Sequence, residues 1–379
     1  MKKGWQTKNL GDLCDVVGGG TPPKDKPAFY SGDIPWATVR DMRQDVITET
    51  EFRITKDAVK SSATNIIPSG NVVIATRVGL GKVCLIGQDT AINQDLRGIV
   101  PRSDKALVVR YLYWWLKSIA DVIVAEGTGA TVQGVKLPFV KSLQIPVPPM
   151  AEQQRIVGLL DEAFEGLATA KANAEKNLQN ARALFESHLQ SVFTQRGAGW
   201  VEKTLENCCE QIFAGGDVPK DRLSDERTPK FGVPIYSNGE KNDGLYGFTD
   251  VARVTKPSIT VSARGTLGFT AIRTEPFLPV VRLIVLVPDQ TQITLSFLYY
   301  AVVGMDFGNT GTSIPQLTVP NFKESKLHVP SPPEQEAIAE KLDALTEETQ
   351  RLARLYERKL AALEALTQSL LHRAFTGAL

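Results

Sequence analysis

The feature that most constrains this 379-residue sequence is an internal repeat. Residues 128–194 align without a gap on residues 310–376, so that each residue corresponds to the one 182 positions further on. Glu152 and Gln153, for example, fall on Glu334 and Gln335. Upstream the two halves still correspond, but with shifts that vary between 187 and 199. The chain therefore contains two copies of one unit, each with a part of fixed register and a part of variable length.

The part of fixed register is predicted to form one long helix in each copy. From Ile156 and from Ile338 onward, apolar or small residues recur at alternating steps of four and three, with one additional step of four in each copy. This spacing is typical of a coiled coil, and a proline cluster before each segment favours a helix start there. The alternative is two amphipathic helices that each cover a separate core. His188 is the repeat counterpart of Leu370 and is expected to be a packed residue of the seam. The expected seam residues are Ile156, Leu160, Leu167, Leu178, His188, Ile338, Leu342, Leu345, Leu352, Tyr356, Leu363 and Leu370.

The parts of variable length have the pattern of compact domains of mixed α and β structure. Short β-branched runs, such as residues 71–76 and 258–262, are separated by turn residues, and helical patterns occupy residues 104–119 and 294–303. The expected fold class is α+β, with two mixed domains joined by two long helices. The expected domain boundaries are 1–150 for the first domain, 151–195 for the first helix, 196–333 for the second domain and 334–379 for the second helix.

Charge is distributed unevenly behind a net charge of +1. Residues 1–150 hold 19 Lys and Arg against 14 Asp and Glu, whereas residues 196–333 hold 14 of each and both helical segments are slightly acidic. A protein that binds nucleic acid alone usually has a strong positive field, because contacts with phosphates supply most of its sequence-independent affinity. If this chain binds DNA, it should therefore need basic partners.

The sequence contains no recognisable signature of an enzyme, a metal site or a membrane span. The loop from Gly79 to Lys82 lacks the residues of a phosphate-binding Walker A loop and is expected to be a hairpin turn. The four cysteines do not have zinc-ligand spacing, and the apolar runs are too short to span a membrane. We expect no catalytic residue, no metal and no cofactor, and a cytoplasmic location.

Several segments together resemble a known family. They are residues 34–42 (IPWATVRDM), 75–83 (ATRVGLGKV), 91–101 (AINQDLRGIVP), 143–161 (LQIPVPPMAEQQRIVGLLD) and 329–343 (VPSPPEQEAIAEKLD). The chain resembles the specificity subunit of type I restriction-modification systems over essentially its whole length. The most specific part is a proline cluster followed by Glu-Gln at the start of a long helix, which occurs twice. The second half departs from the pattern, with Val280-Val281 in place of Asn93-Gln94 and residues 232–240 (GVPIYSNGE) in place of residues 34–42.

The resemblance implies a non-catalytic subunit that recognises DNA sequence. It implies two target-recognition domains, held apart by an antiparallel pair of helices, that each read one half of a bipartite, asymmetric site in double-stranded DNA. Two methyltransferase subunits and the ATP-driven restriction subunits are the implied partners. Two alternatives stay open: a scaffold whose coiled coil and end domains bind only proteins, and a solitary methyltransferase, for which the sequence shows no cofactor site.

Candidate DNA contacts were selected from loops that carry Arg, Lys, Asn, Gln, Ser and Thr. Arg reads guanine and Asn or Gln reads adenine in the major groove, while Ser and Thr bind phosphates. For some of them a structural role is the alternative: Asn93 and Gln94 would cap a strand end, and Arg77 and Arg264 would pair with a carboxylate. The candidates are Thr38, Arg40, Arg77, Lys82, Asn93, Gln94 and Lys136 in the first domain, and Ser237, Asn238, Lys241, Arg264, Thr266 and Gln316 in the second.

Overall fold

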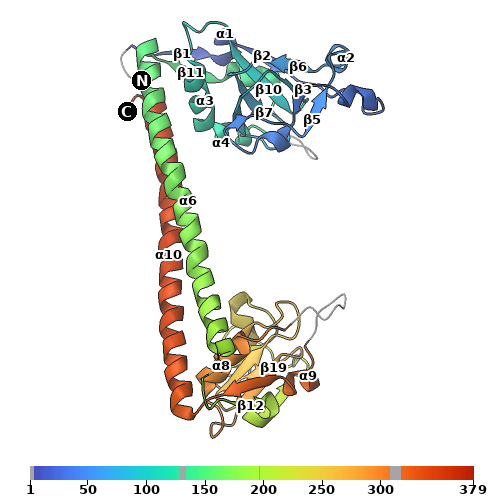
Figure 1. Cartoon of the computed structure of the whole chain (residues 1–379), viewed down its shortest axis with the longest axis vertical. Helices are drawn as coiled ribbons and strands as arrows, with labels where there is room; N and C mark the ends of the chain where they lie inside the picture. Colours follow the sequence, from blue (N-terminus) through green and yellow to red (C-terminus); the bar gives the residue numbers. More distant parts are fainter. Residues whose placement is uncertain (1–3, 128–133, 196, 308–316) are drawn as a thin grey trace. The chain divides into compact units, whose positions relative to one another are not determined.

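The computed structural model describes residues 4–127, 134–195, 197–307 and 317–379. The chain forms two compact units, one made of residues 1–174 and 358–379 and the other of residues 175–357. Each unit contains one α/β domain and part of both long helices, α6 (Met150–Gln195) and α10 (Pro332–Thr376) (Figure 1). The expected class of mixed α/β domains with two long helices is confirmed.

The first α/β domain extends from β1 to β11. Its strands, in chain order, are β1 (Gln6–Asn9), β2 (Cys14–Gly18), β3 (Ile34–Ala37), β4 (Val46–Ile47), β5 (Phe52–Ile54), β6 (Asn65–Ile67), β7 (Val72–Ala75), β8 (Val83–Ile86), β9 (Thr90–Ile92), β10 (Leu96–Pro101) and β11 (Gln144–Val147). Its helical elements are α1 (Leu10–Leu13), η1 (Pro27–Tyr30), η2 (Val39–Asp41), α2 (Lys56–Lys60), α3 (Val109–Ser118), α4 (Ala120–Ala125) and α5 (Leu137–Ser142).

Two sheets form the body of this domain. One has the strand order β2-β10-β7-β8-β4 and the other β5-β3-β9-β6, while β1 and β11 pair separately. Helix α3 carries a run of buried aromatic and leucine side chains that packs with β7 and β8 into the main core. The expected hairpin is present, because β7 and β8 are antiparallel neighbours joined by the loop around Gly79.

The second α/β domain extends from β12 to β20. Its elements are β12 (Val201–Thr204), α7 (Leu205–Cys208), β13 (Cys209–Ala214), β14 (Val233–Tyr236), η3 (Lys241–Gly244), β15 (Leu245–Thr249), β16 (Ser258–Val261), β17 (Thr270–Arg273), β18 (Leu278–Pro279), β19 (Ile284–Pro288), α8 (Leu295–Val303), α9 (Val319–Lys323) and β20 (Lys326–Val329). The strand orders are β13-β19-β16-β17, β15-β14-β18 and β12-β20.

The two domains share one topology. In each, one strand has an antiparallel and a parallel partner: β3 pairs antiparallel with β5 and parallel with β9, and β14 pairs antiparallel with β15 and parallel with β18. The antiparallel strands β2-β10-β7-β8 likewise correspond to β13-β19-β16-β17. The repeat therefore extends through the parts whose sequence register varies, and the second domain lacks counterparts of β4 and β6 among its described residues.

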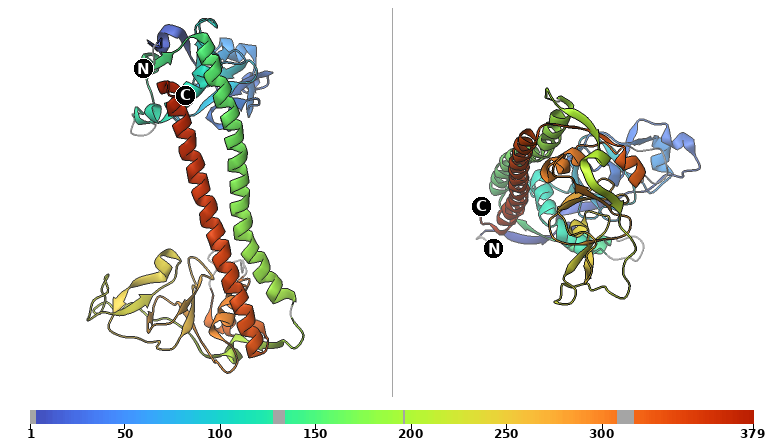
Figure 2. Two further views of the ribbon diagram at one scale, coloured as in Figure 1. Left: turned by 90° about the vertical axis from the view of Figure 1, so that its left-hand side faces the viewer. Right: turned by 90° about the horizontal axis from the view of Figure 1, so that it is seen from below.

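The helices α6 and α10 pack against each other within each unit, and run in opposite directions there (Figure 2). In the first unit the start of α6, with Ile156 and Leu160, shares a core with Leu371 and Ala374 near the end of α10. In the second unit the end of α6 and the start of α10 meet in the same way. No helix in the described part of the chain is both long and apolar enough to cross a membrane.

The seam follows the expected positions along most of both helices, with one correction. Every expected seam residue is buried or half-buried except His188, which is exposed, and Leu189 beside it is buried instead. The prediction for His188 was wrong because the pattern continues with a second step of four, from Phe185 to Leu189. Between Ala170 and Val192 the seam positions follow steps of four, four and three residues, and this set of steps occurs twice. The period is therefore eleven residues, or about 3.67 residues per turn, close to the 3.6 of the α-helix.

A buried glutamine fastens each domain to the start of its long helix. Gln153 accepts a hydrogen bond from the backbone N–H of Val108 (2.9 Å) and donates to the carbonyls of Ala106 (3.1 Å) and Pro148 (2.9 Å). Its repeat counterpart Gln335 accepts from Thr294 N–H and donates to the carbonyls of Gln292 and Pro330. The exposed fractions of the two side chains are 0% and 1%. The Glu-Gln element of the sequence motif thus supplies a three-bond clamp.

A second contact repeats about three turns after the start of each long helix. Asp161 accepts hydrogen bonds from Trp114 Nε1 (2.7 Å) and Arg110 Nε (2.9 Å), both on α3. At the corresponding place Asp343 accepts from the hydroxyl of Tyr300 on α8. In the first unit the two contacts together fix the orientation of α3 on α6, and in the second unit they fix the orientation of α8 on α10. Each domain is thereby oriented on its own part of the long helices.

Candidate nucleic-acid interface

Three loops converge at one edge of the first domain. They are the Thr38 loop (residues 38–45, after β3), the Arg77 loop (76–82, between β7 and β8) and the Asn93 turn (93–95, after β9). The backbone N–H of Asn93 bonds to the carbonyl of Ala37 (3.0 Å), and that of Thr76 bonds to the carbonyl of Asp95 (2.8 Å). The β3–β9 and β7–β10 pairings place these loops together, since each loop begins where its strand ends.

A pocket of about 650 Å³ lies between these loops and brings four candidate residues together. Its lining includes Thr38, Arg40, Asn93 and Gln94. Aromatic rings form another part of the wall, where Trp36 makes edge-on contacts with Tyr30 and Phe52, and the remaining lining residues are Thr21, Lys24, Val39, Val78 and Asp95. The site combines polar groups that can bind base edges with apolar surface that can contact a thymine methyl group.

Two of these candidates are used to shape the loops. The Asn93 amide donates to Asp95 Oδ2 (2.9 Å) and accepts from Asp95 N–H (3.0 Å), and its side chain is only 5% exposed. Thr38 caps the short helix η2, accepting from Arg40 N–H and bonding through its hydroxyl to Asp41. The structure favours the alternative role for Asn93, a cap at the end of β9. Gln94 is half-buried and accepts from the hydroxyl of Thr21.

The cationic candidates are exposed at the same edge. Arg40, with 72% of its side chain exposed, has its Nη1 atom 3.7 Å from Oε2 of Glu51. The Nη1 atom of Arg77 lies 3.7 Å from Oδ1 of Asp95, which gives Arg77 the carboxylate partner expected if its role is structural. Lys82 ends the Arg77 loop and is exposed. Lys136 is also exposed and follows Val135, whose N–H bonds to the carbonyl of Thr76 (2.8 Å).

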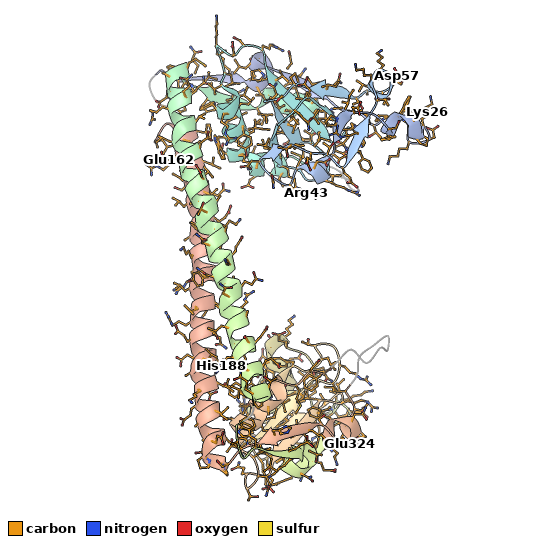
Figure 3. All side chains as sticks on the ribbon, viewed as in Figure 1. Lys26, Arg43, Asp57, Glu162, His188 and Glu324 are labelled. Atoms are coloured by element: carbon orange, nitrogen blue, oxygen red, sulfur yellow. The ribbon has the colours of Figure 1, made fainter. Side chains whose placement is uncertain are left out.

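Sequence reasoning missed two residues at this edge. Arg43, labelled in Figure 3, is exposed three positions after Arg40, and its Nε donates to the carbonyl of Arg40. The Arg-x-x-Arg spacing was the available signal, because residues three apart lie on one side of a 3₁₀ turn. Phe52 is an exposed aromatic residue at the pocket. It belongs to a different strand from the candidates, and no local pattern indicated it.

In the second domain the three loops that correspond to those of the first domain also converge. They are the Asn238 loop (residues 237–244, after β14), the Arg264 loop (262–269, between β16 and β17) and the Val281 turn (280–282, after β18). The backbone N–H of Val280 bonds to the carbonyl of Tyr236 (2.9 Å), the bond that Asn93 makes with Ala37 in the first domain. Leu317 N–H bonds to the carbonyl of Ala263, as Val135 does to Thr76.

The described second-domain candidates lie on these loops, but both the nitrogen and the oxygen of the Asn238 amide are engaged in the cluster. It donates to the carbonyl of Val281 (2.5 Å) and accepts from the N–H of Ala263 (2.8 Å), so it joins all three loops. Ser237 bonds through its N–H to the carbonyl of Gly244 (2.9 Å). Lys241, Arg264 and Thr266 are exposed on the loops. Gln316 lies outside the described residues.

Burial shifts the pKa of two groups beside these loops. Burial raises the pKa of Tyr236 above its usual value, with Arg273 opposing the shift. Burial also raises the pKa of the Cys84 thiol, on β8 beside the Arg77 loop, to about 11, so the thiol is protonated at neutral pH. Within the described ranges no group of three or more His, Cys, Asp or Glu could hold a metal ion.

Comparison with known proteins bears on the whole chain. A family model, the type I restriction modification DNA specificity domain, matches residues 2–178 and again residues 198–358. The specificity subunit of the type I restriction enzyme EcoR124I/EcoR124II of Escherichia coli is 36% identical over 162 residues, which is 41% of this chain and 40% of that protein. The MjaIX specificity subunit of Methanocaldococcus jannaschii is 30% identical over 193 residues, 49% of this chain and 44% of that protein.

The matched regions thus span less than half of the length of these two relatives. A solved chain from a study of complex assembly and conformational transition of the type I restriction-modification system has a TM-score of 0.82 at 20% identity, covering 100% of this chain and 99% of its own. That similarity concerns the fold. The two family-model matches cover most of the sequence, and they fall on the two halves of the internal repeat. This chain belongs to the type I restriction-modification specificity subunit family, whose specificity domain it contains twice.

Proposed function

We propose that this chain is the DNA-sequence-recognition subunit of a type I restriction-modification complex, with each α/β domain reading one half of a bipartite, asymmetric target in double-stranded DNA. The observation that carries the proposal is the cluster of three loops that recurs in both domains with different side chains. One architecture with two sets of polar loops is suited to two different half-sites. Asn93-Gln94 in one domain, for example, stands where the other has Val280-Val281.

In this proposal the chain does no chemistry. Two methyltransferase subunits and the restriction subunits dock on it, and the complex acts on DNA in the cytoplasm. The weak charge of the chain supports a dependence on partners. In the second domain, where positive and negative charges are equal in number, Arg222, Arg227 and Lys256 are already paired with carboxylates.

The isolated chain is expected to bind duplex DNA weakly, because its second domain is electrically neutral and its two long helical segments are acidic. A dissociation constant in the range of non-specific binding, about 10⁻⁴ to 10⁻⁶ M at physiological salt, is expected for the chain alone. With its methyltransferase partner, binding to the target should become at least about 10³-fold tighter. Fluorescence anisotropy with one target duplex and one scrambled duplex measures both values. Tight, sequence-specific binding by the isolated chain would contradict the proposed division of labour.

Exchanging residues 1–150 for the equivalent part of a relative with a known target is expected to change one half-site only. The second domain keeps its own clamp through Gln335 and its own contact through Asp343, so its placement on its helices does not depend on the exchanged part. Sequencing of methylated positions in host DNA, with and without the exchanged gene, gives the motif. A scaffold that binds only proteins would leave the methylated motif unchanged.

A further inference from the structure

Four residues of the described chain other than glycine have a left-handed backbone, and all four lie in the second domain. They are Asn242 (φ 51°), Asp243 (φ 56°), Val281 (φ 54°) and Arg282 (φ 62°). Each pair is consecutive, and β-branched valine is among the residues that avoid this region most strongly. Such conformations persist only where the surroundings enforce them, and they concentrate at functional sites. The two strained pairs belong to the Asn238 loop and the Val281 turn.

The two residues that join the strained turns are Ser237 and Asn238. The Ser237 N–H bonds to the carbonyl of Gly244, directly after the strained Asn242 and Asp243. The Asn238 side chain donates to the carbonyl of Val281 itself (2.5 Å). Both turns are therefore held on one short segment, and the Asn238 acceptor contact with Ala263 N–H ties that segment to the Arg264 loop.

A buried cation supports the first strained turn. Arg273, on β17, is 4% exposed. It pairs with the carboxylate of Asp243, donates to the carbonyl of Asp243 (2.7 Å) and to Thr260 Oγ1 (3.1 Å), and lies 3.7 Å from the centre of the Tyr236 ring. Burying a charge is costly unless it is fully paired. Here its hydrogen bonds go to the strained residue, on both main chain and side chain, and so hold the turn in place.

The side chains at the tips of the two turns are exposed. Neither Asn242 nor Arg282 has a hydrogen bond or ion pair from its side chain among the described residues, and both are solvent-exposed. By contrast, the Asn238 amide already donates to Val281 and accepts from Ala263. Six other cations of the domain are in ion pairs: Arg222, Arg227, Lys256, Arg273, Lys323 and Lys326. A rigid turn with an unengaged amide or guanidinium is preorganised to bind a partner group, because little order is lost on binding.

We propose that Asn242 and Arg282 are specificity-determining residues of the second domain, and that Asn238 and Arg273 are positioning residues that hold their turns. The proposal rests on the proposed function. An asparagine amide pairs with two atoms of adenine and an arginine guanidinium with two atoms of guanine in the major groove, so the second half-site should contain one position read by each. Asn238, the candidate chosen from the sequence, acts through its neighbours.

Glycine substitutions separate base reading from folding. Asn242→Gly and Arg282→Gly remove the side chain at positions whose left-handed backbone glycine adopts without strain, so the melting temperature of the full chain should stay the same or rise. In the complex with its methyltransferase partner, each variant should lose about 10- to 100-fold of the discrimination at one base pair of the second half-site. The measurement is methylation of a duplex panel in which each position of the target is varied. The first half-site should be read as before.

Val281→Gly is the comparison variant, because it relieves the same kind of strain without removing a hydrogen-bonding side chain, so it should lose far less discrimination at the Arg282 position than Arg282→Gly does. Asn238→Asp, which loses the donor to Val281, should weaken discrimination at the Arg282 position, and adding Arg282→Gly should then cost little more at that position. Full discrimination at every position by both Asn242→Gly and Arg282→Gly would overturn the inference. So would a uniform loss of binding to all duplexes by folded variants. If the wild-type complex shows no sequence preference at all, the proposed function fails as well, and that result is distinct from the others.

Discussion

Replacing Gln153 with leucine is expected to lower the free energy of unfolding of the first unit by about 3–5 kcal/mol. The change leaves the N–H of Val108 and the carbonyls of Ala106 and Pro148 without the partner that Gln153 supplies. A buried polar group without a partner costs about 1–3 kcal/mol, and the added apolar contact of leucine offsets only part of the sum. Urea unfolding of the full chain, followed by fluorescence of the tryptophans on α3, measures the loss.

The neighbouring substitution Gln154→Leu is a matched control, since Gln154 is exposed on the same turn of α6 and should change stability by less than about 0.5 kcal/mol. The repeat supplies a second test: Gln335→Leu should produce a loss of similar size in the second unit, because Gln335 makes the same three bonds. Equal stability of the Gln153 and Gln154 variants would show that the clamp does not hold the domain on its helix.

Inserting eleven residues after Ala174 in α6 alone is expected to break the helix pairing of one unit. The start of α6 packs against the end of α10 in one unit, and the end of α6 packs against the start of α10 in the other. Lengthening one helix by about 16 Å makes it impossible to keep both sets of contacts. Exposing about three seam residues should cost roughly 5 kcal/mol, and complex-dependent methylation of the target should be lost.

A matched insertion after Tyr356 in α10 should restore both pairings, since Tyr356 is the repeat counterpart of Ala174 and eleven residues make just over three whole turns. Stability should recover. Methylation of the original target should not, because 16 Å corresponds to about five base pairs of DNA, or half a helical turn. The half-site sequences should stay as they were. If the doubly lengthened chain methylates the original target fully, the helices do not set the distance between half-sites.

Much of the architecture was predictable from local sequence. Apolar residues that recur about every 3.5 residues predict a helix whatever the rest of the chain does, and the constant shift between copies predicts two helices of matching register. The strand runs around residues 71–76 and 258–262 and the helical patterns ending near residues 119 and 303 are found at β7, β16, α3 and α8. Each of these signals depends on neighbours within a few residues of one another.

The seam near the end of α6 shows where local pattern fails. A step of three to His188 and a step of four to Leu189 both fit the helix, and only the packing against α10 and α8, where Leu189 shares a core with Leu342 and Tyr300, selects Leu189. The role of Gln153 was hidden for the same reason. Its motif was visible, but two of the three groups that it binds, on Val108 and Ala106, lie 45 and 47 residues earlier in the chain.

The candidate interface depends most on tertiary structure. Polar and glycine residues between the strands predicted where the loops lie, but not which of their side chains remain available. Nothing in the sequence distinguishes Asn93 and Asn238 from exposed asparagines, yet both amides are engaged: Asn93 bonds to Asp95 within its own turn, and Asn238 bonds across the loop cluster to Val281 and Ala263. The left-handed turn at Val281 runs against the preference of valine and exists because Asn238 and the neighbouring backbone hold it. Periodicity determined the helices and strands of this protein, whereas hydrogen bonds between distant segments decided which loop residues face outward, since those bonds form only once the strands have brought the loops together.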